Sequence, residues 1–354
     1  MYHHYQIDQT YDWNYENAPP EPNSSRPDAS GEATARRWTF MGRRVASPVG
    51  VAAGPLLNGR WIRYYAALGF DVLTYKTVRS SARACYEPPN LTFVDCGQLD
   101  GSHTSVPHAK SPSDSWAVSF GMPSKEPDVW RRDVEDTRRQ LPNDKVLSVS
   151  VVGTMQPGWS IDELADDYAL CARWAVESGA DCIETNFSCP NVTSCDGQLY
   201  QSPDDAKTVA ERVRASIGDA NYLIKIGHFA GIANRGTSAE QFLRAIAPFA
   251  DGIVTTNSIA AKVVTDTGNN LFDGQPRGIC GDAIRDESMR QTRELKRIVV
   301  SANLPLCIVG VGGISSAAHV RAYLDAGADL VQLATAAMLD PGIGMKIRRQ
   351  LARR

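Results

Sequence analysis

The sequence predicts one (β/α)8 barrel with an N-terminal extension and with inserted loops over its active site. Eight short runs rich in β-forming residues recur along the chain, and helical stretches of roughly 10 to 20 residues separate most of them. The chain has 354 residues, enough for one large barrel or for two ordinary domains. Its first strand–helix turn lacks Gly-x-Gly-x-x-Gly, which argues against an open dinucleotide-binding sheet.

The expected elements follow from local composition. Each strand is a short run of apolar, mostly β-branched residues, and each helix is a longer run with polar positions interspersed. Ser160 and Glu163 have the spacing of a capping box and mark one helix start. The expected strands begin near residues 49, 70, 146, 181, 222, 252, 306 and 329. The expected helices cover 59–68, 128–139, 160–178, 204–217, 238–246, 282–302, 316–326 and 342–353.

Two segments lie outside this alternation. We expect residues 1–45 to form an extended arm ahead of a barrel at 46–354, because they are polar and carry several prolines as far as Arg37. Such an arm could wrap around the core or reach a second subunit. Residues 77–115 are rich in Ser, Pro and Gly, and a loop this long is expected to be functional or to contain short strands of its own.

Composition narrows the class of protein. Hydrophobic residues make up 43% and charged residues 22%, as in soluble globular proteins, and the formal net charge is −3. This charge gives no reason to expect nucleic acid or an anionic membrane as a partner. We expect no membrane span and no secretion signal. The eight cysteines include no Cys-x-x-Cys, so we expect no metal centre, and their apolar surroundings suggest the reducing cytoplasm.

The segment from Asn186 to Asn191 carries the most specific chemical signal. It follows the fourth expected strand, and in a barrel the functional residues lie at the C-terminal ends of the strands. Carboxamides flank Cys189, and a carboxamide has the donors and the acceptor that suit an amide-bearing ring. A thiol there could move a proton. A lone cysteine, however, is more often an inert core residue.

Lys225 lies within an apolar strand, Leu-Ile-Lys-Ile. Burying an ammonium group without a partner is costly, so this lysine should meet an anion or an electron-rich acceptor. An ion pair with a neighbouring carboxylate is the structural alternative.

A glycine-rich turn, Gly310–Ile314, follows the seventh expected strand, and Ala334-Thr335 follows the eighth. Glycines let backbone N–H groups point at a phosphate, and these two loops are the usual phosphate site of phosphate-binding barrels. The alternative is a tight strand–helix connection. The position of the turn favours a phosphorylated cofactor or substrate.

Together these residues resemble the dihydroorotate dehydrogenase family of FMN-dependent barrels, over roughly Ser47 to the C-terminus. The motifs that carry the resemblance are Asn186-Phe187-Ser188-Cys189-Pro190-Asn191, Thr256-Asn257-Ser258-Ile259, Gly310-Val311-Gly312-Gly313-Ile314, Tyr75-Lys76 and Lys225. A cysteine at position 189 resembles the soluble class. The membrane-associated class has serine there and an N-terminal apolar helix.

The resemblance implies an FMN oxidoreductase acting on a CH–CH bond of a cyclic amide. Cys189 would take a proton from the ring carbon next to the one that gives hydride to flavin N5, with Lys76 and Ser188 in the catalytic set, and Lys225 would lie at the N1/C2 carbonyl side of the flavin. The implied substrate-binding residues are Asn186, Asn191, Asn257, Ser258, Ser119, Gly121 and Met122. The implied FMN-binding residues are Ala52, Ala53, Gly54, Lys76, Thr77, Lys225, Thr256, Gly281, Gly310, Gly312, Gly313, Ala334 and Thr335.

The chain departs from the family pattern at one loop. Where the family has Asn-Ser-x-Gly-Leu-Pro-Asn, this chain has Val118-Ser119-Phe120-Gly121-Met122-Pro123-Ser124. Val118 and Ser124 therefore replace two carboxamides, and losing one hydrogen bond to a buried ring can cost about 1–3 kcal/mol. The family's Gly-Asn-Pro-x-Pro-Arg segment is only loosely matched by Tyr86–Asn90.

Four hypotheses remain open. The first is oxidation of dihydroorotate to orotate in pyrimidine biosynthesis, and the second is the same chemistry on another cyclic amide such as a dihydropyrimidine. The third is a flavin-free, phosphate-binding barrel lyase or isomerase with Lys225 as a Schiff-base nucleophile. The fourth is a non-catalytic relative. The electron acceptor is open between fumarate, quinone and oxygen, since NAD would require a separate subunit, and the resemblance implies a homodimer.

Overall fold

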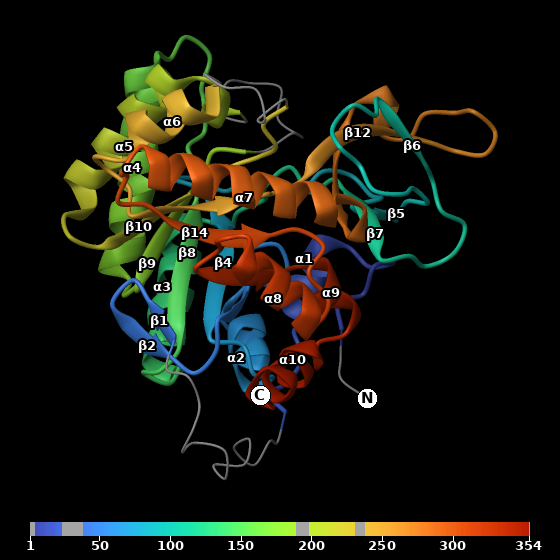
Figure 1. Cartoon of the computed structure of the whole chain (residues 1–354), viewed down its shortest axis with the longest axis horizontal. Helices are drawn as coiled ribbons and strands as arrows, with labels where there is room; N and C mark the ends of the chain where they lie inside the picture. Colours follow the sequence, from blue (N-terminus) through green and yellow to red (C-terminus); the bar gives the residue numbers. More distant parts are fainter. Residues whose placement is uncertain (1–3, 23–37, 189–197, 231–237, 354) are drawn as a thin grey trace.

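The core of the protein is a closed barrel of eight parallel strands. The computed structural model describes residues 4–22, 38–188, 198–230 and 238–353 (Figure 1). Each barrel strand is hydrogen-bonded to the next one along the chain, and the last pairs with the first. The (β/α)8 prediction is therefore confirmed. The barrel strands are β3 (Val49–Val51), β4 (Val72–Val78), β8 (Val146–Val151), β9 (Cys182–Asn186), β10 (Asn221–Lys225), β11 (Gly252–Thr255), β14 (Cys307–Val311) and β15 (Leu330–Leu333).

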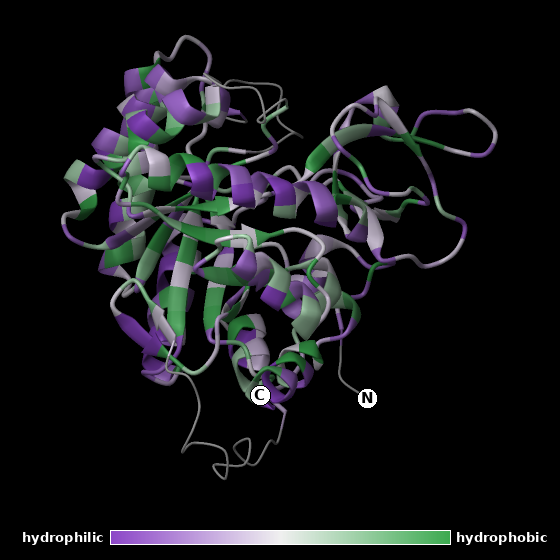
Figure 2. Ribbon diagram, in the orientation of Figure 1, coloured by the Kyte–Doolittle hydropathy of each residue, from purple (hydrophilic) through white to green (hydrophobic). Residues whose placement is uncertain are grey.

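One long helix follows each barrel strand, close to its expected bounds. These are α2 (Gly59–Ala67), α3 (Pro127–Gln140), α4 (Ile161–Glu177), α5 (Pro203–Ile217), α6 (Ser238–Ile246), α7 (Arg285–Ser301), α8 (Ala317–Asp325) and α10 (Ile343–Ala352). The helices show polar outer faces while the strands are apolar (Figure 2). The capping box forms as expected, because the backbone N–H of Ser160 donates to Glu163 Oε2 at 2.7 Å.

The structure also contains short helices that the sequence did not predict, because a few residues are too few to show a helical pattern. The five-residue helix α9 (Thr335–Leu339) follows β15 directly. Single 3₁₀ turns also occur at η3 (Leu199–Gln201), η4 (Phe272–Gly274) and η5 (Asp282–Ile284).

A second sheet of five strands lies beside the mouth of the barrel, at the upper right of Figure 1. Two chain segments build it, one after β4 and one after β11. Residues 77–115 thus do contain short strands, whereas the sequence did not indicate the second segment. A separate apolar cluster that includes Val94, Val263 and Ile279 packs on this sheet. Its order is β5 (Leu91–Phe93), β7 (Ser115–Val118), β13 (Arg277–Gly281), β12 (Ile259–Val264) and β6 (Ser105–Pro107).

A hairpin closes the opposite end of the barrel. Strands β1 (Trp38–Phe40) and β2 (Arg43–Val45) pair antiparallel. Phe40 packs into the cluster formed by Val72, Val146 and Cys182, which are first residues of barrel strands. The apolar cluster therefore lies at the N-terminal ends of the barrel strands. The polar side chains described below lie at the C-terminal ends.

The N-terminal segment packs closely against the barrel. It contains a short helix, α1 (Tyr11–Glu16), capped by the Thr10 side chain, that the polar composition did not indicate. Tyr5 and Tyr11 are buried in the main core. A six-residue helix is not stable alone, so tertiary contacts must hold it.

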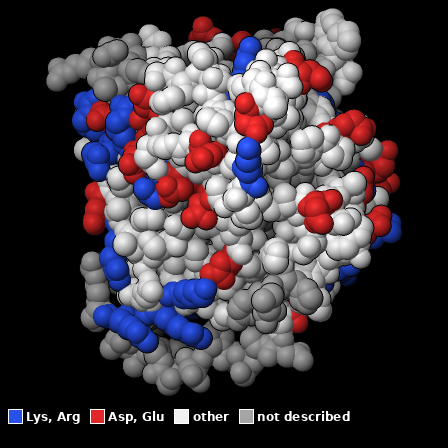
Figure 3. Space-filling model, turned by 90° about the vertical axis from the view of Figure 1, so that its right-hand side faces the viewer, with Lys and Arg blue, Asp and Glu red and all other residues white. Residues whose placement is uncertain are grey.

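The charged surface is mixed in sign. On the face shown in Figure 3, acidic side chains spread over the centre and right edge, and basic side chains gather at the lower left. Wide uncharged areas separate them, in keeping with the small net charge. Within the described ranges, no helix combines the length and the apolar character needed to cross a membrane.

Candidate active site

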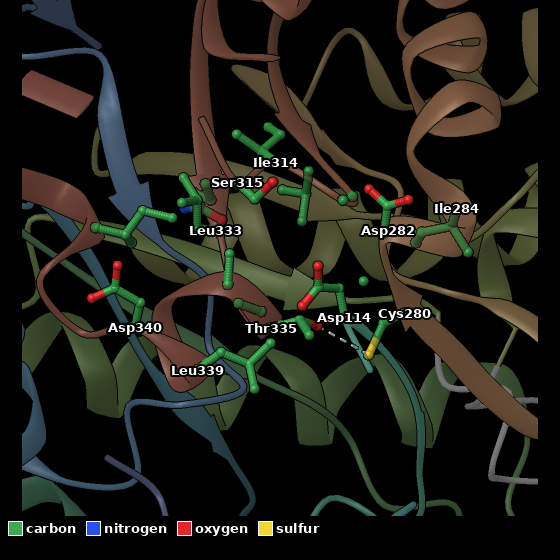
Figure 4. A pocket seen from close by; sticks show the side chains of 18 of the residues that line it. Asp114, Cys280, Asp282, Ile284, Ile314, Ser315, Leu333, Thr335, Leu339 and Asp340 are labelled. Carbon is green, nitrogen blue, oxygen red and sulfur yellow. Dashed lines mark hydrogen bonds between the residues drawn. The ribbon is translucent and has the colours of Figure 1, made fainter. Parts of the chain in front are cut away.

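A cavity opens at the C-terminal ends of β14 and β15, beside β13 (Figure 4). Its empty volume is about 710 Å³, part of which is open to solvent. The structure brings together six of the residues singled out from the sequence. Those lining the cavity are Asn257, Gly281, Gly312, Gly313, Ala334 and Thr335.

The glycines of this cavity are required by its backbone geometry. Gly281 has φ +91°, and a Cβ there would lie 2.0 Å from the carbonyl oxygen of Asp114. Gly312 has φ +128°, and its Cβ would lie 2.3 Å from Ser288 Oγ. Only glycine tolerates both the conformation and the contact, so these two residues are required for the backbone course that lines the cavity.

An anion in this cavity would be held by backbone N–H and hydroxyl groups, and three carboxylates also line the cavity. Among the described lining residues there is no lysine or arginine, so a phosphate would rely on backbone N–H groups and on Ser315 and Thr335. These carboxylates belong to Asp114, Asp340 and Asp282 (Figure 4). Asp340 is paired with Lys346, and Asp282 is paired with Arg285 of α7. These pairings reduce the repulsion between the two paired carboxylates and a bound anion.

Cys280 forms part of the cavity wall and was not singled out from the sequence. Its thiol accepts a hydrogen bond from Thr335 Oγ1 at 3.4 Å (Figure 4). Burial raises the pKa of this thiol to about 11, so it remains protonated at neutral pH. It therefore serves as a small, inert wall group.

Two lysines and an asparagine lie at the mouth of the barrel. Asn186 ends β9 and pairs in register with Lys225, which ends β10, while Lys76 lies in β4. Strand side chains alternate between faces, and Cys182 of β9 and Leu223 of β10 belong to the interior cluster. Asn186 and Lys225 therefore share the inward face, and both lysines are buried.

Glu184 lies one inward position below Asn186 and was overlooked in the sequence. It is fully buried, and neither carboxyl oxygen has a hydrogen-bond partner. Desolvation raises its pKa, while Lys225 and Ser150 act in the opposite direction. The expected alternative for Lys225, a bonded ion pair with a neighbouring carboxylate, is therefore not formed with Glu184. A carboxylate within a buried strand was the signal that could have revealed this residue.

The amide-bearing side chains form one contiguous group. Asn186 Oδ1 accepts from the backbone N–H of Ser188 at 3.1 Å, and its Nδ2 lies 3.6 Å from Met122 Sδ. Asn257 Nδ2 donates to the carbonyl of Ser188, and the neighbouring Ser258 is half-buried. Cys189 and Asn191 lie outside the described residues, so their roles stay predictions.

The loop 118–124 is held in place by two arginines that the sequence analysis missed. Arg79 is fully buried, and its Nε donates to the carbonyl of Met122 at 3.1 Å. Arg277 Nε donates to Ser119 Oγ at 2.7 Å from the neighbouring strand β13. A charged residue at the end of the apolar run of β4 was the available signal for Arg79.

The other expected cofactor residues lie on or directly after three of the barrel strands. Ala52 and Ala53 follow β3 in buried positions, next to the exposed Gly54. Thr77 Oγ1 lies 3.0 Å from Ser150 Oγ, and Thr256 Oγ1 accepts from Gln291 Nε2 at 2.9 Å.

Gly310 is placed differently from the other glycines. A Cβ there would lie 2.5 Å from the Tyr323 ring of α8, so this glycine permits strand–helix packing. It does not line the cavity in the described part of the chain.

Comparison with known proteins agrees with this geometry. The sequence profile of the family described as dihydroorotate dehydrogenase matches residues 107–354. The dihydroorotate dehydrogenase of Dictyostelium discoideum is 30% identical, over 97% of this chain and 95% of that protein. The chain belongs to the dihydroorotate dehydrogenase family. It is accordingly an oxidoreductase acting on CH–CH bonds.

Other members of the dihydroorotate dehydrogenase family are more distant. The dihydroorotate dehydrogenase (quinone) of Aeromonas salmonicida (strain A449) is 26% identical over 84% of this chain and 81% of that protein. The dihydroorotate dehydrogenase B (NAD(+)) catalytic subunit of Oceanobacillus iheyensis is 30% identical over 51% of this chain and 57% of that protein. A crystal structure of DHODH from Eimeria tenella in complex with ferulenol has a TM-score of 0.73 and 15% identity, covering 96% of this chain and 88% of that one.

The residues of this dihydroorotate dehydrogenase family member fit a flavin mononucleotide. A glycine cradle forms its outer end, and Asn257 brings its inner end to the amide-bearing group. The buried ammonium of Lys225 at the barrel mouth offers a counter-charge for an electron-rich ring.

Proposed function

We propose that this chain oxidises dihydroorotate to orotate with FMN bound in the cavity. One observation carries the proposal: Asn257 lines the glycine-cradled cavity and also bonds to the group that contains Ser188 and Asn186. A phosphate-binding end and a ring-binding end thus adjoin through one side chain. The matching family and its Dictyostelium member support the same reaction.

When bound, FMN supplies the hydride acceptor at N5. The protein's contribution is electrostatic, since the Lys225 ammonium would stabilise negative charge at the N1/C2 carbonyl side. Desolvation favours the neutral form of the Glu184 carboxyl below it, because the pKa of that group is raised.

The carboxamides orient the substrate ring. Asn186, Asn191 and Asn257 can each donate to a ring carbonyl and accept from a ring N–H. Asn186 Nδ2 contacts only the soft Met122 sulfur within the described residues, so a ring carbonyl can replace that contact. Such fixed positions lower the barrier by holding the reacting carbon in place.

Cys189 is the proposed base. Its thiolate takes the proton from the ring carbon adjacent to the carbon that releases hydride, and the substrate thereby loses two hydrogens and gains a C=C bond. The thiolate is the competent form, and the buried ammonium of Lys76 at the barrel mouth would favour it. Ser188, next in the chain, is held by Asn186 and Asn257 and so positions this segment.

A second candidate substrate is another cyclic amide, such as a dihydropyrimidine. Val118 favours this variant, because it removes a carboxamide from the loop that ends at Met122 and Ser124. For the electron acceptor we propose a quinone or NAD(+). These are the acceptors in the names of the Aeromonas and Oceanobacillus relatives. From the family resemblance we infer a homodimer, and from the cysteine usage a cytoplasmic location.

Anaerobic mixing of the purified holoprotein with dihydroorotate, and separately with dihydrouracil, tests the proposal. We expect the flavin absorbance to bleach rapidly with dihydroorotate and slowly with dihydrouracil. Bleaching by dihydrouracil alone would establish the second candidate. A protein that binds no flavin would overturn both candidate reactions. It would favour the flavin-free hypothesis, in which Lys225 forms a Schiff base.

A further inference from the structure

We propose that the N-terminal segment, residues 5–16, is a positioning element for the loop 118–124 and thereby sets the affinity for substrate. This inference rests on the proposed function, which assigns that loop to substrate binding. It concerns residues outside the reacting centre, which act through Phe120 and Lys125.

The first contact is aromatic. The ring of Phe120 lies between Ser119 and Gly121 in the loop and is buried. The Tyr5 ring meets it edge-on with centroids 6.3 Å apart, and the Tyr11 ring meets it at 6.1 Å. Aromatic pairs of this edge-to-face geometry attract each other beyond the effect of the area that they bury.

The second contact is ionic and lies at the end of the loop. Lys125 Nζ is 2.7 Å from Asp12 Oδ1 of α1, and it lies 4.8 Å from the centre of the Tyr15 ring. Three side chains of α1 therefore contact the loop at Phe120 in its middle and at Lys125 just beyond its end.

The segment is itself fixed to the barrel. Asn58 Nδ2 donates to the carbonyl of Tyr15 at 2.7 Å, and Trp61 Nε1 donates to the carbonyl of Asn14 at 3.0 Å. Both donors belong to the start of α2, a helix of the barrel wall. The N-terminal segment is therefore fixed to α2 and in turn fixes the position of the loop.

The loop needs such support because its backbone is strained. Met122, a residue with a side chain, has φ +53°, next to Gly121 at φ +70°. Strained conformations persist only where the surrounding structure holds them in place. Met122 contacts Asn186, so relaxation of this backbone would displace the amide-bearing group.

The test compares Tyr11→Ala with Tyr11→Phe in the full-length holoprotein. We expect Tyr11→Ala to raise the KM for the bleaching substrate by about tenfold, while kcat at saturation and bound flavin stay within about twofold. Tyr11→Phe keeps the ring and should retain the native KM. If Tyr11→Ala does not fold, Tyr11→Leu replaces it, since it fills the core without an aromatic edge.

Amide hydrogen exchange of residues 118–124 provides a readout that is independent of the substrate. We expect faster exchange in Tyr11→Ala and native exchange in Tyr11→Phe. Unchanged KM and exchange in a folded, active Tyr11→Ala variant would overturn the inference, and so would an equal loss in Tyr11→Phe. If the native protein bleaches with neither substrate while exchange still responds, the proposed function fails and the positioning role stands.

Discussion

The two ends of the candidate site are built in different ways. The proposed phosphate end, formed by Gly281, Gly312, Gly313, Ala334 and Thr335, presents backbone from three strand ends within the last quarter of the chain. The ring end, formed by Met122, Asn186, Ser188 and Asn257, presents side chains from three distant segments. Backbone sites tolerate few residue types, whereas side-chain sites can exchange one donor for another.

This difference predicts opposite responses to substitution. A change at the phosphate end should affect cofactor affinity and leave ring specificity unaltered. A change at the ring end should alter turnover or substrate preference and leave flavin bound. Five variants test the comparison, from the largest expected effect to the smallest.

The largest effect is expected for Cys189→Ala at the ring end. Removal of a general base lowers turnover by about 10²–10⁴-fold, while flavin content should be unchanged. Steady-state turnover and the flavin-to-protein absorbance ratio measure both quantities. Cys96→Ala, a half-buried thiol near the five-stranded sheet, is the matched control. Near-native turnover of Cys189→Ala would remove the assigned base.

Gly281→Ala should cause the next largest effect, at the phosphate end. The new Cβ must move the backbone of Asp114, so we expect FMN affinity to fall by about 10–100-fold. Flavin fluorescence on dilution measures the dissociation constant. Gly97→Ala is the control, because no atom lies within 4 Å of its Cβ position. Equal flavin affinity in both variants would contradict the assignment of this end.

Lys225→Met lies between the two ends and should affect flavin reduction. Loss of the buried ammonium removes a charge that stabilises the reduced ring, so we expect reduction by substrate to slow by about tenfold. Anaerobic stopped-flow absorbance measures this rate. Lys207→Met on the exposed side of α5 is the control. An unchanged reduction rate and an unchanged flavin content would show that Lys225 has no role at the cofactor.

Val118→Asn tests the ring end by gain of function. A restored carboxamide that reaches the ring should improve kcat/KM for dihydroorotate by about fivefold, corresponding to roughly 1 kcal/mol. Val129→Asn, an exposed valine on α3, controls for the added polarity. Improvement with dihydrouracil in place of dihydroorotate would identify the other cyclic amide as the substrate.

The smallest effect is expected in stability, for Glu184→Gln. The pKa of Glu184 is raised in the folded state, so between its unfolded and folded values the native protein binds the extra proton. Stability of the native protein therefore falls as pH rises through that window. We expect Glu184→Gln to remove this dependence and to melt a few degrees higher at neutral pH, at about 2–4 °C per kcal/mol. Glu211→Gln on the surface of α5 should match the native pH profile, and identical profiles for all three proteins would contradict the burial argument.

The two ends of the site also differ in how well the sequence predicted their residues. Lys225 could be singled out because a charge within an apolar strand is conspicuous, and the strand itself was readable from its neighbours. Glu184 carried the same kind of signal, a charged residue within a buried strand, and was overlooked. Arg79 and Arg277 hold the loop 118–124 through contacts between segments more than 40 residues apart, which no local pattern encodes.

The sequence by itself determined the repeated strand–helix pattern, the glycine-dependent backbone of the phosphate end and the residue types of the ring end. These depend on local sterics and on periodicity, which act within a few residues. Only the tertiary structure decided that Tyr5 and Tyr11 of a polar N-terminal segment pack on Phe120, and that a second sheet flanks the mouth of the barrel. Those contacts depend on how surfaces distant in the chain bury one another, and burial is a property of the whole fold.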